Sequence, residues 1–422
     1  MGISMQKKKL GLYIHIPFCH SKCAYCDFYS QSNAGDELMQ RYVDALRLQL
    51  EDYSAATRNY TVDTVFIGGG TPTVLPVKTM CELIGTITRC YNLSKDVEFT
   101  MEANPATVSL AALTKYRKLG VNRLSLGLQS ANADELTALS RIHSTSDFEA
   151  SFTAARKAGF DNINIDIMYG IPLQTAESFS NTLNYAASFD PEHISVYGLK
   201  IEDGTPFARM RETLILPDED TEADMYLDCV SYLSVCGFRH YEISNFARPG
   251  CECRHNLKYW NCDEYLGFGC AAHSYFSNMR FSTKRDLMLF IDAMEADISR
   301  GGIMGNDGMG ITESQLKNAQ PIDEFYQLTP SERVGEYIML RLRLCDGISS
   351  SEFESRFGIN FDAVYGRRLQ IYIDNGFMKY DGDRYAFTTK GMYVSNYILS
   401  TILDFDKDSR IVGGIADGSD KA

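Results

Sequence analysis

Six short apolar runs, separated by longer helical stretches, constrain the fold of this chain more than any other feature. The runs cover residues 12–16, 64–67, 98–102, 123–129, 163–168 and 193–199. The segments between them are long enough for crossover helices, so we expect the runs to pair as parallel strands. Six βα units are fewer than the eight of a closed barrel, which takes about 250 residues. The sequence therefore predicts an α/β fold with an incomplete (β/α)6 barrel of the TIM type.

Each run also has one polar side. In the fourth run, Leu124 and Leu126 share one face, while Ser125 and Gln129 share the other. Parallel strands that are covered on both faces are usually apolar throughout. Because the crossover helices need the apolar side, we expect the polar side to face a wide interior that holds a polar ligand. The alternative is that the polar sides meet solvent, as in an antiparallel sheet.

Three cysteines follow the first run at C-x3-C-x2-C spacing, namely Cys19, Cys23 and Cys26. A [4Fe–4S] cluster needs one ligand for each iron, so three thiolates leave one iron open to a small molecule. Scattered buried cysteines and a zinc site are the alternatives, but zinc usually has a second ligand pair at its own short spacing. The spacing therefore predicts a metal site with three protein ligands.

The composition limits the kinds of partner. The net charge is −14, which argues against broad nucleic-acid binding. No run approaches the roughly 18 apolar residues of a membrane span. Twelve cysteines without a secretory leader predict reduced thiols and a cytoplasmic location.

A glycine-rich turn and four other segments accompany the cysteines. The turn at residues 68–70 lets the backbone approach a ligand closely. Together with the cysteines, segments 15–19, 66–73, 102–105, 123–130 and 165–172 resemble the radical S-adenosylmethionine (SAM) superfamily. Within it they are similar to the branch of HemN, an oxygen-independent coproporphyrinogen III dehydrogenase, and HemW, a heme chaperone. The resemblance spans most of the first 270 residues and implies a [4Fe–4S] cluster and SAM.

The same resemblance implies roles for individual residues, although no catalytic residue is assigned. Cys19, Cys23 and Cys26 would ligate the cluster. The residues expected to contact the cluster-bound SAM are Tyr13, Gly69 and Glu102. The residues expected to line a second SAM position are Tyr25, Gly70, Thr71, Gln129, Arg141 and Asp166. Solvated strand ends are the alternative for the two carboxylates, and a surface salt bridge is the alternative for the arginine.

Two features separate the relatives. HemN-type proteins carry a further cysteine shortly after the third ligand, whereas Asp27 and Phe28 follow Cys26 here. The segment 255–260, His-Asn-Leu-Lys-Tyr-Trp, resembles the motif that marks HemW and holds the only tryptophan of the chain. Its candidate heme residues are His255, Tyr259 and Trp260. An imidazole can be an axial ligand and the aromatic rings can stack on a porphyrin, while a packed loop with a hydrogen-bonded histidine is the alternative.

The closest resemblance therefore implies a heme chaperone that delivers heme to an acceptor protein. It also implies a reductant for the cluster and a homodimer. The alternative is an oxidoreductase that decarboxylates coproporphyrinogen III to protoporphyrinogen IX. Radical SAM modification of RNA is a weaker alternative, because the chain is acidic.

Outside the barrel, we expect three further regions. Residues 241–328 would form an extension with the His-Asn-x-x-Tyr-Trp motif and a glycine-rich loop, following a barrel over 1–240. Residues 329–403 would form a winged-helix-like α+β domain, and 404–422 a flexible tail. Four more cysteines lie near the motif, at Cys251, Cys253, Cys262 and Cys270. Their spacing matches no common zinc or ferredoxin pattern, so buried thiols are preferred over a second metal site.

Overall fold

The computed structural model describes residues 7–299 and 311–403. The chain divides into two compact units, of which the first combines residues 1–218 with 263–326 and the second combines 219–262 with 327–422. The segment expected as a single extension, 241–328, is thus shared between the two units. The glycine-rich stretch 301–310 and the tail 404–422 lie outside the described residues.

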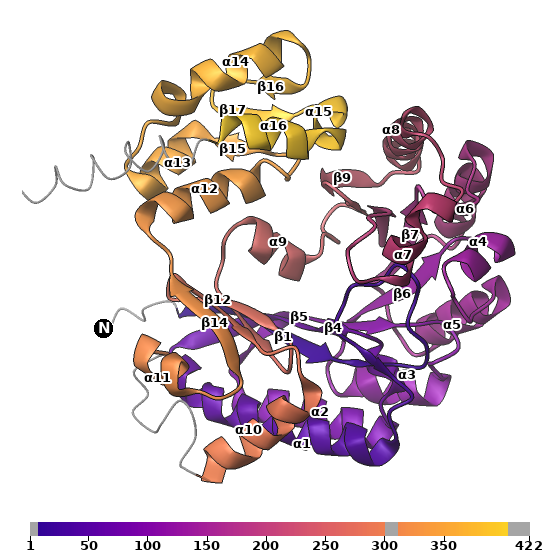
Figure 1. Ribbon diagram of the computed structural model, residues 1–422, viewed down its shortest axis with the longest axis vertical. Helices are drawn as coiled ribbons and strands as arrows, with labels where there is room; N and C mark the ends of the chain where they lie inside the picture. The colour runs from indigo at the N-terminus through magenta and orange to yellow at the C-terminus, as the bar shows by residue number, and fades with distance from the viewer. Residues whose placement is uncertain (1–6, 300–310, 404–422) are drawn as a thin grey trace, which may run out of the picture. The chain divides into compact units, whose positions relative to one another are not determined.

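Six parallel strands form the framework of the first unit, as the sequence predicts (Figure 1). They are β1 (Lys8–Ile16), β4 (Tyr60–Gly69), β5 (Leu93–Ala103), β6 (Arg123–Gln129), β7 (Ile163–Tyr169) and β8 (His193–Gly198), and they are neighbours in this order. Each pair of neighbours is parallel. Two short strands, β2 (Phe18–Cys19) and β3 (Gln31–Ser32), close the loop that follows β1.

Helices connect these strands, and their ends follow from local sequence. The helices are α1 (Asp36–Ser54), α2 (Val77–Cys90), α3 (Leu110–Lys118), α4 (Ala133–Ala138), α5 (Thr145–Lys157), α6 (Ala176–Ser188) and α7 (Pro206–Met210), with short 3-10 turns at Ala55–Thr57, Pro72–Val74 and Arg211–Thr213. Ser144 and Asp147 form a capping box that starts α5. Gly120 and Gly159 follow α3 and α5 with φ of 110° and 88°, as expected for glycines that end helices.

A second group of strands extends the sheet beyond β1. Strand β11 (Tyr265–Phe268) pairs in parallel with β1, and β12 (His273–Phe276), β13 (Met279–Thr283) and β14 (Ile322–Gln327) continue outward. Helices α10 (Leu287–Ser299) and α11 (Glu313–Asn318) accompany them. The sequence analysis predicted no strand here, because these runs are short and mix polar with apolar residues.

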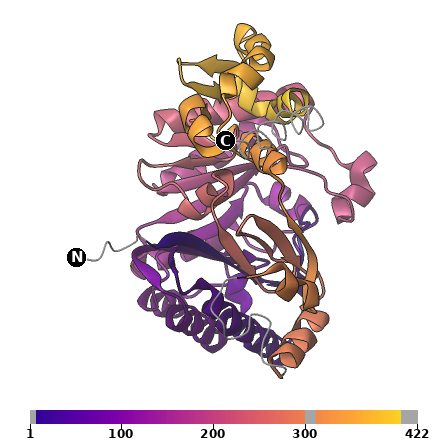
Figure 2. The same cartoon turned by 90° about the vertical axis from the view of Figure 1, so that its left-hand side faces the viewer.

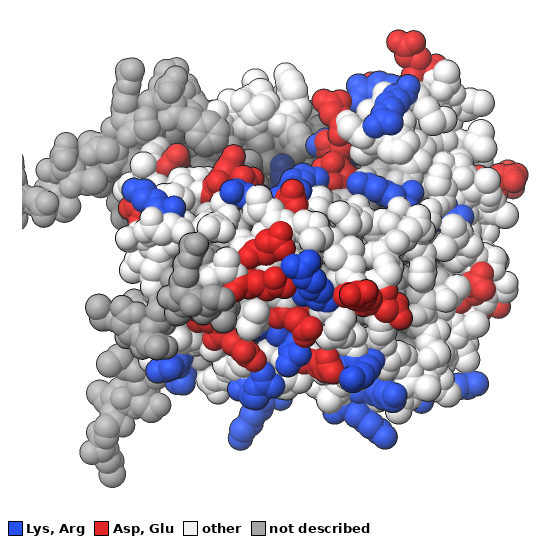
Figure 3. Space-filling view, turned by 60° about the horizontal axis from the view of Figure 1, so that its bottom comes forward, with Lys and Arg blue, Asp and Glu red and all other residues white. Residues whose placement is uncertain are grey.

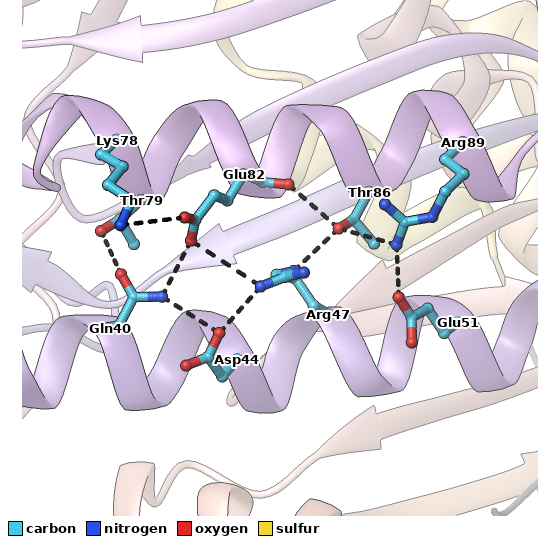
Figure 4. Close-up of polar contacts among 9 residues, drawn as sticks. All are labelled: Gln40, Asp44, Arg47, Glu51, Lys78, Thr79, Glu82, Thr86 and Arg89. Carbon is cyan, nitrogen blue, oxygen red and sulfur yellow. Dashed lines mark hydrogen bonds and ion pairs between the residues drawn. The ribbon is translucent and has the colours of Figure 1, made fainter.

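Helices α1 and α2 lie side by side beneath the sheet (Figure 2). Their exposed face mixes acidic and basic side chains instead of gathering one sign (Figure 3). Polar contacts join the two helices, for example Arg47 Nε to Thr86 Oγ1 at 3.0 Å and Arg89 to Glu51 at 2.6 Å (Figure 4). Exposed pairs of this kind add only about 0–1 kcal/mol each to stability.

The second unit begins with α8 (Glu219–Val235), the hairpin strands β9 (Arg239–Glu242) and β10 (Asn245–Ala247), and the short helix α9 (Arg254–Trp260). Its C-terminal part contains α12 (Pro330–Arg341), β15 (Ile348–Ser349), α13 (Ser350–Phe357), a π-helical segment (Asp362–Gly366), α14 (Arg367–Asp374), β16 (Met378–Tyr380), β17 (Arg384–Phe387), α15 (Thr389–Tyr393) and α16 (Ser395–Ile402).

This C-terminal part has the arrangement that the sequence predicts for a winged-helix-like domain. Helix α12 precedes a small antiparallel sheet with the spatial order β15-β17-β16. In the sequence, α13 and α14 lie between β15 and β16. Val394 separates the last two helices, α15 and α16. Across the described ranges, no helix is both long and apolar enough to cross a membrane.

Candidate functional site

The three-cysteine loop is fastened to the barrel on both sides. Within it, the amide of Cys26 donates to the carbonyl oxygen of Cys23 at 3.2 Å, which forms a tight turn. The amide of Ala24 donates to the carbonyl of Leu139, and the carbonyl of Ala24 accepts from the amide of Phe207. The loop is therefore held by backbone bonds from elements far away in the sequence.

The cysteine thiols lie close enough to influence one another. All three are partly buried. The pKa of Cys26 is raised to about 11, mainly by burial. The nearby Cys23 and Cys19 also raise it, whereas a hydrogen bond with the backbone of Phe28 lowers it. Burial also raises the pKa of Cys19. A bound metal cluster would reverse this tendency, because it takes up thiolates and releases their protons.

A [4Fe–4S] cluster and a single metal ion place different demands on their ligands. Across residues 7–299 and 311–403, no three His, Cys, Asp or Glu side chains converge as one metal ion would require. A [4Fe–4S] cluster instead takes one thiolate for each iron, so its ligands are spread over the corners of a cube.

The glycine-rich turn after β4 packs directly against the backbone that leads into the cysteine loop. The amides of Gly70 and Thr71 donate to the carbonyl oxygens of Ile16 and Phe18, at 2.9 and 2.7 Å. A Cβ atom on Gly70 would lie 2.7 Å from the oxygen of Phe18, so a side chain has no room there. The Thr71 hydroxyl donates to the Cys19 sulfur at 3.6 Å. The turn thus positions a hydroxyl group on the first predicted cluster ligand.

Two carboxyl groups, Glu102 on β5 and Asp166 on β7, lie on the polar face of the sheet. Protein surrounds both, although each keeps some accessible surface. Burial raises the pKa of Glu102 to about 8, and the charge of Asp166 raises it further. The amide of Gly69 donates to Glu102 Oε2 at 3.0 Å and favours the charged form. These two carboxyls are not solvated strand ends.

Further polar side chains complete this face. Asp166 accepts hydrogen bonds from Ser125 Oγ at 2.8 Å and from Asn164 Nδ2 at 2.7 Å. The Asn164 oxygen lies 2.6 Å from His193 Nδ1 and accepts from Ser195 Oγ at 3.1 Å. The polar sides of neighbouring strands therefore meet one another below the surface and do not face bulk solvent.

Arg141 comes from the segment after α4 and lies among the predicted site residues. Its side chain donates to Asn104 Oδ1 at 3.1 Å, while its Nε has no hydrogen-bond partner among the described residues. A Cβ on Gly127 would approach both Gln129 Nε2 and an Arg141 nitrogen within 2.9 Å, so these side chains lie together above that glycine. Burial lowers the pKa of Arg141, but the neighbouring Tyr25 raises it, with a net upward shift. This guanidinium group is partly buried, and within residues 7–299 and 311–403 it forms no salt bridge of the kind considered as the alternative.

Tyr13 on β1 points its hydroxyl toward His15 Nδ1, at 3.0 Å. His15 Nε2 lies 2.9 Å from the carbonyl oxygen of Tyr29. Because a carbonyl can only accept, Nε2 carries the proton and Nδ1 accepts from Tyr13. His15 was not predicted as a site residue, although it stands two positions after Tyr13 on the same face of the strand.

Asn104 is a second residue that the sequence analysis missed. It donates to Thr71 Oγ1 at 2.9 Å and accepts from Arg141, so it links the glycine-rich turn to the guanidinium group. Asn104 follows Glu102 by two residues and lies just past the end of β5, so its role became apparent only from these contacts. A pocket opens at this place, lined by His20, Ser21, Cys23, Thr71, Val74, Asn104, Pro105, Thr107, Ser140, Arg141, Ile142 and His143.

The His-Asn-x-x-Tyr-Trp segment forms the short helix α9 in the second unit, where the sequence analysis had predicted no helix. Its four-residue spacing brings His255 Nε2 to 2.8 Å from Tyr259 Oη. The two rings meet edge to face, with centroids 5.1 Å apart. His255 is only 1% exposed, whereas Tyr259 and Trp260 keep part of their surface accessible.

The hairpin of β9 and β10 contributes a buried carboxyl to the same unit. Glu242 is fully buried, and burial raises its pKa to about 7. Neither of its oxygens makes a hydrogen bond of normal geometry within the described residues, although Asn245 and Trp260 lie close enough to favour the charged form. His240 Nε2 is likewise buried without a hydrogen bond in this part of the chain.

The four cysteines near the His-Asn-x-x-Tyr-Trp motif differ in burial. Cys253 and Cys270 are buried, and Cys251 and Cys262 are partly buried. Among the described residues, no metal-binding group of three or more ligands includes them.

Comparison with known proteins agrees with this geometry. Residues 13–186 match the family model of the Radical SAM superfamily, and residues 328–394 match that of the HemN C-terminal domain. The chain is 34% identical over 397 residues to the heme chaperone HemW of Bacillus subtilis (strain 168), covering 93% of this chain and 98% of that one. The heme chaperone HemW of Escherichia coli (strain K12) is 33% identical over 394 residues, with the same two shares. The solved structure of E. coli coproporphyrinogen III oxidase (HemN) has a TM-score of 0.79 at 23% identity, over 94% of this chain and 90% of that one.

The parallel barrel, the three-cysteine loop and these matches define a radical SAM protein, a class whose members use a [4Fe–4S] cluster and SAM. Because relatives above 30% identity are matched over nearly their full length, the chain belongs to the HemW family within this superfamily.

Proposed function

We propose that this protein is a heme chaperone, which binds heme together with a [4Fe–4S] cluster and SAM and passes the heme to an acceptor protein. The observation that carries the proposal is the match, over almost the whole chain, to proteins named heme chaperone HemW. The helix α9 supports it, because the segment resembling the HemW motif folds so that His255 and Tyr259 lie together.

The residues of the first unit fit the cluster and SAM. Cys19, Cys23 and Cys26 would hold three irons. When bound there and reduced, such a cluster would supply an electron for cleavage of the sulfonium of SAM. Tyr13, Gly69 and Glu102 would contact the SAM at the open iron. The partly buried guanidinium of Arg141, whose Nε has no hydrogen-bond partner among the described residues, suits a carboxylate.

The remaining predicted contacts lie where a second polar ligand could be bound. Gln129 and Arg141 lie together above Gly127, and Asp166 stands on the adjacent strand β7. Gly70 and Thr71 stand at the turn beside Cys19, and Tyr25 belongs to the cysteine loop. These residues would orient the ligand and limit the access of water.

Heme binding is tested by titrating the purified chain with heme and recording optical spectra. Saturable binding near one heme per chain is expected for the wild type. His255→Ala should weaken the binding, whereas His20→Ala, a histidine outside α9, should not. Absence of saturable binding by the wild type would end the proposal.

The alternative activity is tested separately. An anaerobic assay with coproporphyrinogen III and SAM would release two molecules of carbon dioxide per porphyrinogen if the chain were a dehydrogenase. The proposal predicts no such release with an intact, reduced cluster, because Asp27 and Phe28 follow Cys26 where HemN-type proteins have a further cysteine nearby.

A further inference from the structure

The contact between His255 and Tyr259 decides which side chain an iron can reach. Both residues stand on α9, and His255 Nε2 lies 2.8 Å from Tyr259 Oη. The imidazole is 1% exposed, while the phenol is partly accessible. An iron atom bound at His255 Nε2 would have to enter a buried position. It would also have to displace the oxygen of Tyr259, which lies where the lone pair or proton of Nε2 points. Tyr259 is the more exposed residue of the pair, so an iron atom that approaches its side chain is less deeply buried.

We propose that the phenol oxygen of Tyr259 is the axial ligand of ferric heme, and that His255 positions this oxygen. The proposal rests on the proposed heme-binding function and names the ligand atom within it. Tyrosine is one of the known protein ligands of heme iron. A bond forms between the iron and Tyr259 Oη, the O–H bond breaks, and the proton passes to His255 Nε2. The oxidation state of the iron does not change.

The geometry explains the roles of both residues. The four-residue spacing on a helix places the two side chains on one face, so Nε2 is fixed beside the hydroxyl before the ligand arrives. Nε2 accepts the phenol proton in the tautomer that carries its hydrogen on Nδ1. The edge-to-face packing of the rings, at an interplanar angle of 84°, holds the hydroxyl in that direction. A nitrogen beside the oxygen then stabilises the phenolate that the iron binds.

The test compares ferric heme binding by full-length variants. Tyr259→Phe is expected to weaken ferric heme binding by about tenfold or more and to remove the phenolate-to-iron charge-transfer band. Tyr259→His should restore binding with the spectrum of a nitrogen-ligated heme. His255→Ala should keep the charge-transfer band while lowering the affinity. Tyr397→Phe, at a tyrosine that is 69% exposed, is the matched control and should behave as the wild type.

The proposal is overturned if Tyr259→Phe keeps the wild-type spectrum and affinity while His255→Ala loses them, since the histidine would then be the ligand. Tighter heme binding by Tyr259→Phe would overturn it as well. Absence of saturable binding by the wild type would instead overturn the proposed heme function. Circular dichroism of each variant shows that it is folded, and Tyr259→His tests the position even if Tyr259→Phe is unstable.

Discussion

The polar interior of the barrel and the β9–β10 hairpin bury similar groups but treat them differently. In the barrel, Asn164 makes contacts of 2.6 to 3.1 Å with Ser125, Asp166, His193 and Ser195. In the hairpin, Glu242 is as deeply buried, yet neither of its oxygens has a hydrogen bond of normal geometry within the described residues.

This difference shows that burial alone does not decide how much a polar group contributes to the stability of the fold. A satisfied network fixes the positions of its members, and losing one member leaves several groups unpaired. A buried carboxyl without good partners opposes its own ionisation and costs stability when it is charged. The barrel interior should therefore tolerate substitution poorly, and the hairpin should gain from losing its charge.

The strongest test of the comparison is Asn164→Leu. It should lower the free energy of unfolding by about 3–5 kcal/mol, because Asp166 and His193 lose partners while remaining buried. Urea unfolding followed by circular dichroism measures the loss. Asn181→Leu, at an exposed position on α6, is the control and should change stability little. Equal effects of the two substitutions would show that the network adds nothing.

Glu242→Gln tests the other side of the comparison through its pH dependence. The folded pKa of about 7 exceeds the usual carboxyl value, so the folded state binds the proton more tightly. Stability contributed by the protonated form is therefore lost as the pH rises from about 4.5 through 7. The variant should be more stable than the wild type by about 2 kcal/mol at pH 8, and nearly equal to it at pH 5.

Fluorescence of Trp260, the only tryptophan, reports this unfolding in the second unit. Glu219→Gln, at an exposed position of α8, serves as the control and should show no such pH-dependent gain. A stability difference that is independent of pH would contradict the assignment of the effect to the charge of Glu242.

Ser195→Ala tests the edge of the barrel network. The hydroxyl of Ser195 donates one hydrogen bond of 3.1 Å to Asn164, and Asn164 would keep its other partners in the variant. The expected loss is about 1 kcal/mol, measured by urea unfolding. A loss as large as that of Asn164→Leu would mean that the network fails as a unit.

The smallest effect is expected on the exposed surface. Arg89 pairs with Glu51 at 2.6 Å, but both side chains are about half exposed (Figure 4). Arg89→Ala should cost less than about 1 kcal/mol, and the cost should shrink in high salt. A larger loss that salt does not reduce would indicate packing by the arginine stem, which Arg89→Met would restore.

The sequence predicted the barrel strands well, because alternation such as that of Leu124, Ser125 and Leu126 is strong and local. It also placed Glu102 and Asp166 on the polar face for the same reason. Strands β11 to β14 could not be predicted, since their short mixed runs become strands only by pairing beyond β1. The roles of Asn104 and His15 became apparent only from contacts with other segments.

The hairpin shows the limit most clearly. The environment of Glu242 depends on Arg343 and Cys345, about a hundred residues away in the sequence, whose titrations it influences. The motif on α9 could be predicted in part from the sequence. The four-residue spacing of His255 and Tyr259 on a helix predicts that their side chains meet. Only the fold shows that the imidazole is the buried partner.

The most direct test of the whole account is an anaerobic reconstitution with iron, sulfide and heme that measures all three per chain. The account predicts about four cluster irons, four sulfides and one heme in the wild type. In Cys19→Ala the cluster iron and the sulfide should be lost while the heme remains, because the proposed heme residues lie on α9 in the other unit. A wild type that takes up no iron and sulfide, or a cysteine variant that keeps them, would contradict the account.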